Sequence, residues 1–298
     1  MSALATTAAA PRPRIAANRP LRWWRRNTWW VLSIASLSGA IALVLAIFLH
    51  VFALGIPALR PSVFTTVTNG VSGGLANALA GTFLLTTCGV LLVVFLGFGT
   101  AIYVAEYAQP RVAAAVRFIN DVLAGVPSIV VGYFGYVVLV IGLGWQFSLA
   151  AGAIALAIIM LPYVMRGADL ALSDVPRELR EGALALGATS ETALRTVALP
   201  YALPGMLTAL LLAIGIALGE TAPLLYTAGW SNYLPSLAPT HAPVAFLTYV
   251  VWTFINEPFP QAHALAYAAA TILIVLILVT NVVARIAIDS IVRRSRGS

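Results

Sequence analysis

The sequence predicts an all-α membrane protein with six transmembrane helices. Hydrophobic residues make up 61% of its 298 residues and charged residues only 9%, whereas soluble domains carry about 25% charged residues. The apolar residues fall into long runs, and about 20 such residues are enough to cross the hydrocarbon core of a bilayer as a helix. A chain so poor in charge cannot cover a water-facing surface, so we expect the lipid bilayer to surround most of it.

Six runs define the expected membrane helices, at about 29–54, 79–104, 119–143, 147–165, 203–226 and 264–288. Pro127 and Pro223 are expected to kink the third and the fifth, because proline lacks the backbone N–H that an inner helical turn needs. A segment rich in Pro, Tyr and Trp covers 229–262. Its apolar stretch 244–255 is too short to span comfortably and fits an external or re-entrant element.

The arginines predict the orientation. All 17 basic residues are arginine, and every one except Arg60 falls on the same side of the six expected helices. Because cytoplasmic loops carry the excess of basic residues, both termini are predicted to lie in the cytoplasm. This agrees with an even number of spans.

The organisation expected from these features has four parts. Residues 1–28 form a basic cytoplasmic N-terminus, disordered to about residue 18, with an interfacial anchor "LRWWRRNTWW". Residues 29–70 hold the first helix and an external loop. The main transmembrane domain covers 71–288, including a cytoplasmic loop at 173–203 and the external segment 229–262. Residues 289–298 form a basic cytoplasmic tail.

Several functions are excluded by composition. A Walker A loop needs a lysine to reach the β- and γ-phosphates, and this chain has no lysine, so it is not an ordinary P-loop ATPase. The single cysteine, Cys88, allows no internal disulfide. His50, His241 and His263 show no metal-ligand spacing. We expect no metal, no cofactor and no nucleic-acid partner.

The loop at 173–203 contains the longest polar stretch within the chain, "ELREGALALGATSETALRTVALP". Ser173 or Asp174 is a suitable N-cap for a helix, and Pro176 suits its first turn. Gly187 can adopt positive φ and end that helix. Thr189 or Ser190 can then cap a second helix. Val175, Leu179, Ala183 and Leu186 recur at helical spacing and give the first helix one apolar face.

This pattern alone also fits an amphipathic linker that lies along the membrane surface. The spacing is more specific than that. Glu181-Gly182-Ala183, three residues, Gly187, nine residues and Val197-Ala198-Leu199-Pro200 resemble the EAA loop of ABC importer permeases, whose pattern is E-A-A, x3, G, x9, I-x-L-P. Gly182 and Val197 are mild departures. In that family the loop docks onto an ATP-binding subunit, so the resemblance implies ATPase-coupling roles for Glu178, Glu181, Gly182, Ala183, Gly187, Leu199 and Pro200.

A second stretch narrows the resemblance. "GETAPLLYTAG" at 219–229, together with "VPRELREGALALGAT" at 175–189, is similar to the PstA-type permeases of the phosphate-specific transport system over about residues 30–290. The resemblance implies a type I (MetI-like) permease fold in a bacterial cell membrane. It implies one half of a heterodimeric channel for inorganic phosphate, with no catalysis in this chain. The implied partners are a PstC-type permease, a PstB-type ATPase dimer that holds ATP and Mg²⁺, and an external PstS-type phosphate-binding protein.

Glu220 is predicted to be the only acidic residue within an apolar span. A charge at membrane depth costs at least about 2.5–3.5 kcal/mol, so such residues usually face a cavity or a partner. We expect Glu220 and the adjacent Thr221 to face the translocation pathway, although Glu220 could instead lie among headgroups if the helix ended near Gly219. PstA-type permeases often carry an arginine four residues earlier, where this chain has Ile216.

Without that arginine, the cation for an anion pathway would come from Arg166, from the partner permease or not at all. Arg166 is otherwise a positive-inside anchor at the end of the fourth run. Three alternatives stay open from sequence: an ABC permease for molybdate, sulfate or an amino acid, a proton-coupled secondary transporter with Glu220 as relay, and a membrane scaffold. The EAA resemblance disfavours the second, because a proton-driven carrier has no ATPase to dock.

Overall fold

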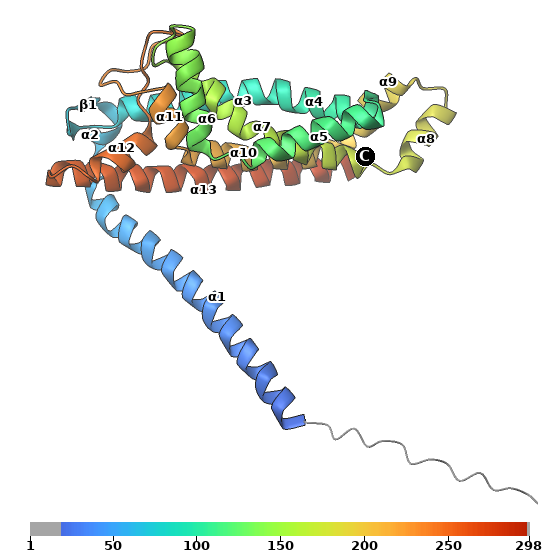
Figure 1. The fold of residues 1–298 in the computed structure, drawn as a ribbon, viewed down its shortest axis with the longest axis horizontal. Helices are drawn as coiled ribbons and strands as arrows, with labels where there is room; N and C mark the ends of the chain where they lie inside the picture. Colours follow the sequence, from blue (N-terminus) through green and yellow to red (C-terminus); the bar gives the residue numbers. More distant parts are fainter. Residues whose placement is uncertain (1–18, 297–298) are drawn as a thin grey trace, which may run out of the picture. The chain divides into compact units, whose positions relative to one another are not determined.

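The computed structural model describes residues 19–296, with side chains described for 28–286 and 288 (Figure 1). The chain divides into two units, Met1–His50 and Val51–Ser298. The first holds most of helix α1 (Arg19–Gly55), whose side chains from Trp29 to Leu49 are exposed within the chain. α1 begins inside the predicted basic segment 1–28, and the predicted disorder of 1–18 lies outside the described residues.

The second unit begins with short elements that lead into its long helices. They are the turn η1 (Ile56–Ala58), helix α2 (Pro61–Thr65) and strands β1 (Thr68–Asn69) and β2 (Ser72–Gly73). The strands pair antiparallel, with Thr68 opposite Gly73 and Asn69 opposite Ser72. This hairpin was not among the elements predicted from the sequence. Its Asn-Gly turn places Gly70 at φ 61°, a conformation that glycine adopts without strain.

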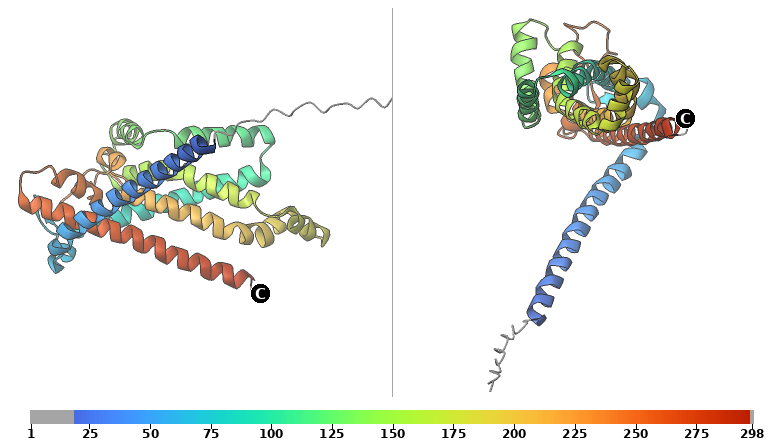
Figure 2. Two further views of the ribbon diagram at one scale, coloured as in Figure 1. Left: turned by 90° about the horizontal axis from the view of Figure 1, so that it is seen from below. Right: turned by 90° about the vertical axis from the view of Figure 1, so that its right-hand side faces the viewer.

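Four long helical runs form the body of this unit, and Figure 2 shows them side by side. α7 (Leu149–Ser173) packs against both α3 (Ala76–Val93) and α10 (Leu199–Gly219), and α10 packs against α13 (Pro260–Arg296). Leu156 and Met160 of α7 are fully buried among them. Two of the four runs consist of several elements. α3 is continued by η2 (Val94–Phe98), α4 (Gly99–Ile102) and η3 (Tyr103–Tyr107), and α10 is preceded by α9 (Ser190–Ala193) and η5 (Leu194–Ala198). α7 and α13 each form a run by themselves.

The expected third span, 119–143, is not one straight helix. α5 (Pro110–Ala124) and α6 (Ser128–Gly135), which continues as η4 (Tyr136–Gly142), meet at 97°. The break falls just before and at Pro127, because proline disfavours helical geometry in the residue before it and cannot donate a backbone hydrogen bond. The described residues therefore hold five helices long and apolar enough to cross a membrane, or six if this bent pair is one span.

The expected fifth span, 203–226, is broken as well. α10 ends at Gly219, Glu220 is extended with φ −71° and ψ 131°, and α11 (Ala222–Thr227) follows. Beyond it, the predicted external segment is irregular up to α12 (Leu247–Phe254), which packs against α13. The all-α membrane fold and the predicted bend at Pro127 are confirmed. The fifth span breaks at Glu220 and Thr221, just before the predicted kink at Pro223.

The polar loop forms α8 (Arg177–Ala185) followed by the turn into α9. In Figure 1, α8, α9 and the C-terminal end of α13 lie at one end of the second unit, while β1, α2 and α12 lie at the other. The polar loop and the break between α10 and α11 are therefore separated along the unit.

Candidate functional site

Glu220 lies in a small cavity between the two helix breaks. The cavity has a volume of about 220 Å³ and is lined by Glu220, by Ser128 and Val131 of α6, and by Ile158, Pro162 and Tyr163 of α7, among others. The Ser128 side chain lines the same cavity as Glu220. Irregular backbone at membrane depth is tolerated where it is buried in protein or lines a cavity, and both breaks meet this condition here.

Close packing of α6 on α11 holds the breaks together. A Cβ atom on Gly132 of α6 would lie 2.5 Å from the Cα of Pro223 in α11, so only glycine allows this approach. The Glu220 carbonyl also accepts a hydrogen bond of 2.7 Å from the Thr248 hydroxyl of α12. Thr221, half-buried, occupies the N-cap position of α11.

Pro162 adds a polar backbone group to the same cavity. It lies inside α7 and has no N–H, so the carbonyl of Ile158 loses its helical partner. Both residues line the cavity with Glu220. The cavity thus combines a carboxylate, a hydroxyl, a phenol and a freed carbonyl in otherwise apolar helices.

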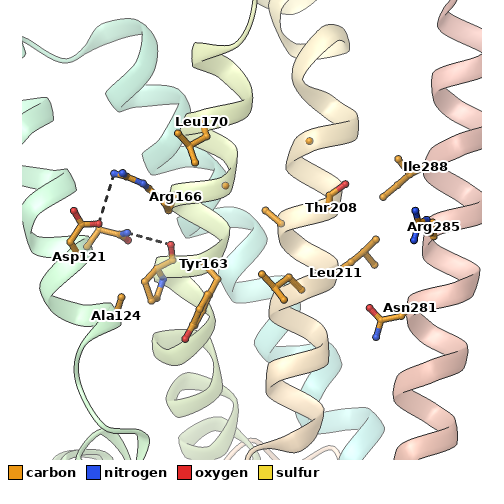
Figure 3. Close-up of a pocket in the computed structure, with 16 residues that line it drawn as sticks. Asp121, Ala124, Tyr163, Arg166, Leu170, Thr208, Leu211, Asn281, Arg285 and Ile288 are labelled. Carbon is orange, nitrogen blue, oxygen red and sulfur yellow. Dashed lines mark hydrogen bonds and ion pairs between the residues drawn. The ribbon is translucent and has the colours of Figure 1, made fainter. Parts of the chain in front are cut away.

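A second, larger cavity adjoins the first at Ala124, Pro162 and Tyr163. It has a volume of about 930 Å³ and lies between α5, α7, α10 and α13 (Figure 3). Arg166 of α7 lines one wall, where its Nη1 atom lies 3.9 Å from Oδ1 of Asp121. Arg285 of α13 lines the opposite wall. Amide and hydroxyl groups complete the polar lining: Asn120, Asn281 and Thr208.

The wall formed by α5 is fixed to α7 by polar contacts. Arg117 donates from Nε to Oδ2 of Asp169 at 2.7 Å and from Nη2 to Oδ1 at 2.8 Å. Asn120 donates to the Pro162 carbonyl at 3.3 Å. Asp169 lies within α7 and is 4% exposed. The prediction that Glu220 is the only acidic residue inside a span is therefore wrong. Asp169 lies in α7, which continues beyond its predicted apolar run, and Asp121 already lies in the run 119–143 and in α5. Glu220 itself follows the last residue of α10.

The polar loop has the predicted helix–turn–helix form, with one predicted cap confirmed at Thr189 and one corrected at the start of α8. α8 begins after Pro176, so neither Ser173 nor Asp174 is its N-cap. Gly187 has φ 88°, as the predicted turn requires. Thr189 caps the next helix by accepting a hydrogen bond of 3.2 Å from the Thr192 N–H.

α8 lies beside α9 and η5 but is hardly covered by them. It contributes no buried residue, and only Arg180 and Ala183 are even partly buried. Of the predicted apolar face, Val175 packs inside the chain, whereas Leu179 is exposed and Leu186 is 91% exposed. Glu178, Glu181 and Gly182 also face outward. Leu199 and Pro200 lie at the start of α10, where Leu199 is partly buried and Pro200 exposed.

The structure brings Glu220 and Arg166 to adjoining cavities and leaves the EAA-like residues at one end of the unit. Sequence reasoning missed Ser128, Asn281 and Arg285 as lining residues. Arg285 was assigned only to the positive-inside count. No local signal places it opposite Arg166, because the two residues are brought together by the packing of α10 between α7 and α13.

Comparison with known proteins agrees with this architecture. The model of the family described as the binding-protein-dependent transport system inner membrane component matches residues 94–297. The chain belongs to this family of transport-system membrane components.

Within that family the chain groups with the permeases named PstA. It is 41% identical over 258 residues to the phosphate transport system permease protein PstA 2 of Mycobacterium bovis, covering 87% of this chain and 86% of that protein. It is 37% identical over 277 residues to the phosphate transport system permease protein PstA of Yersinia pestis, covering 91% and 93%.

Solved structures match at the level of the fold. A bacterial ABC transporter involved in the import of the polysaccharide alginate aligns with a TM-score of 0.63 at 16% identity, over 89% of this chain and 98% of that chain. An inward-facing MetNI methionine ABC transporter aligns with a TM-score of 0.58 at 18% identity, over 78% and 99%. The chain therefore has the MetI-like importer permease fold and is a multi-pass membrane protein.

Proposed function

We propose that this chain is the permease subunit of an ATP-driven importer of inorganic phosphate and forms half of its translocation pathway. The observation that carries the proposal is the identity of 37–41%, over most of the chain, to permeases whose names give phosphate as their cargo. Solved neighbours below 20% identity share the fold but import alginate or methionine, so fold alone does not choose the substrate.

The two adjoining cavities are the chain's contribution to the pathway. Arg166 and Arg285 supply positive charge on opposite walls of the larger one, where a guanidinium group can donate two parallel hydrogen bonds to a phosphate. Glu220 cannot attract an anion by charge. Its carboxylate can accept a hydrogen bond from the hydroxyl that phosphate retains near neutral pH, whereas sulfate has no such hydroxyl. Glu220 would thereby favour phosphate over sulfate.

The exposed α8 is the coupling helix in this proposal. Its outward leucines and acidic residues, among them Leu179, Leu184 and Glu181, form a surface that a groove on a separate ATPase can cover. ATP and Mg²⁺ are then bound by a PstB-type ATPase dimer, and this chain holds no cofactor. A PstC-type permease supplies the other half of the pathway, and a PstS-type protein delivers phosphate from outside.

The orientation follows from the same arrangement. The arginine-rich loops and the exposed α8 belong on the cytoplasmic side, with both termini, in the cell membrane of a bacterium. The segment 229–262 then faces the binding protein.

The test is uptake of ³²P-labelled phosphate by proteoliposomes that hold the complete complex, with binding protein outside and ATP inside. We expect ATP-dependent uptake that excess sulfate, molybdate or amino acids do not reduce. Equal competition by sulfate or molybdate would favour an importer for another anion. Uptake that needs a proton gradient and persists without ATP would support the secondary transporter instead.

A further inference from the structure

Arg180 links α8 to the ends of two membrane-spanning helices. Its Nη1 atom donates to Oε1 of Glu106 at 2.5 Å, and its Nη2 atom donates to the backbone carbonyl of Leu172 at 2.9 Å. Glu106 lies in η3, the last turns of the helical run that begins with α3, and Leu172 lies in the last turn of α7. One side chain thus contacts α8, the α3–η3 run and α7.

The chemistry suits a rigid connection. Leu172 is one of the last residues of its helix, where carbonyls have no N–H partner within the helix and attract positive charge. Guanidinium is planar and can hold two acceptors in a fixed geometry, which a single ammonium group cannot. The side chains of Arg180 and Glu106 are only 27% and 16% exposed, so water screens this contact less than a surface ion pair.

The rest of α8 offers few alternatives. It buries no residue, and Ala183 is the only other residue of the helix that is even partly covered. Open space surrounds Gly182, and the turn at Gly187 is equally open. A force applied to α8 therefore reaches α10 through the neighbouring η5. Apart from the chain connections at the two ends of α8, it reaches the α3–η3 run and α7 through Arg180.

We propose that Arg180 is a positioning residue that transmits movement of α8 to the α3–η3 run and to α7. The inference rests on the proposed coupling role of α8. In this coupling role, closure of the ATPase moves α8, and the Arg180 guanidinium carries that displacement to Glu106 and Leu172 together. The two helices then move with α8 as one body, and the cavities between α5, α7 and α10 change shape with α7.

The experiment measures phosphate transported per ATP hydrolysed in the reconstituted complex. We expect Arg180→Gln to lower this ratio about tenfold, a factor that corresponds to about 1.4 kcal/mol, while ATPase co-purification and the unfolding temperature of the complex stay near wild type. Arg180→Lys should give a ratio between those of wild type and Arg180→Gln, because its ammonium keeps the charge but lacks the planar fork of nitrogens that reaches both acceptors. The exchange Glu106→Arg with Arg180→Glu should restore part of the ratio.

Arg195→Gln is the matched control. Arg195 also belongs to the 173–203 loop and pairs with Glu191 at 2.6 Å, but the pair lies within one helical run and its side chains are 73% and 63% exposed. Its loss should leave the ratio unchanged. If the Arg180→Gln permease does not fold well enough to be purified, Glu106→Gln, which preserves the bond to Leu172, applies the same test.

The outcomes separate this inference from the proposed coupling role. A wild-type ratio in both Arg180→Gln and Glu106→Gln would overturn the transmission role of Arg180. Loss of ATPase co-purification in Arg180→Gln would overturn it too, by placing Arg180 in the docking surface. If the double change Glu181→Ala with Gly187→Ala also left the ratio intact, α8 would not be the coupling helix at all.

Discussion

The Arg117 guanidinium and the Asp169 carboxylate face each other in a two-pronged ion pair, with N–O distances of 2.7 and 2.8 Å. The pair fixes α5 to α7 beside both cavities. Replacing Asp169 with Asn should destabilise the chain by about 1–2 kcal/mol, less than the ~3–5 kcal/mol of a fully buried pair, because the Arg117 side chain is 36% exposed. Thermal unfolding of the purified complex measures this.

The matched control for that variant is Glu191→Gln, which removes a carboxylate from the exposed pair with Arg195. Exposed pairs contribute about 0–1 kcal/mol, so the unfolding temperature should hardly change. An equal decrease in unfolding temperature in Asp169→Asn and Glu191→Gln would mean that the Arg117–Asp169 contact does not hold α5 in place.

Glu220→Gln should reduce phosphate uptake at least about tenfold, because a hydrogen bond to a charged group is worth about 1.5–3 kcal/mol and the amide accepts more weakly. The complex should still assemble, since Gln has nearly the same volume as Glu. The initial rate of ³²P-phosphate uptake is the measurement. Glu191→Gln, in the exposed pair with Arg195, serves as control and should transport normally. Wild-type kinetics in Glu220→Gln would return Glu220 to the headgroup interpretation.

Gly132→Ala should force α6 and α11 apart, because the new Cβ atom would lie 2.5 Å from the backbone of Pro223. Overpacking of this kind costs about 1–3 kcal/mol, and it should lower both the unfolding temperature and phosphate uptake. Gly99→Ala is the counterpart, since no atom lies within 4 Å of its would-be Cβ. In a helix that change should be neutral or stabilising by up to about 1 kcal/mol. Equal stability of the two variants would contradict the close contact.

Changing Glu181 and Gly187 together to alanine should uncouple ATP hydrolysis from phosphate uptake. The first change removes an outward carboxylate, and the second places a Cβ on a residue with φ 88°, which costs roughly 1–2 kcal/mol. Gly144→Ala imposes a similar strain at φ 68°, also with open space around it, but lies outside the loop. It should leave coupling intact, so uncoupling by Gly144→Ala would show a general effect of strain.

The long helices could be predicted because each depends on local composition. The 97° angle between α5 and α6 could not. Pro127 indicates a break, but the angle depends on how α6 packs against α11 through Gly132, a contact between residues remote in sequence. Arg117 and Asp169 are 52 residues apart, and Arg180 and Glu106 are 74 apart. No local pattern pairs them, whereas the EAA-like spacing lies within one loop and could be read directly.

The sparse packing of α8 has a consequence for the chain before it meets its ATPase. A helix without buried side chains opens at little cost in free energy, and its amides should exchange with deuterium far sooner than those of α7. The 173–203 segment should also be the first place where a protease cuts the isolated subunit. Slower exchange and resistance to cleavage would then report assembly directly, without any transport assay.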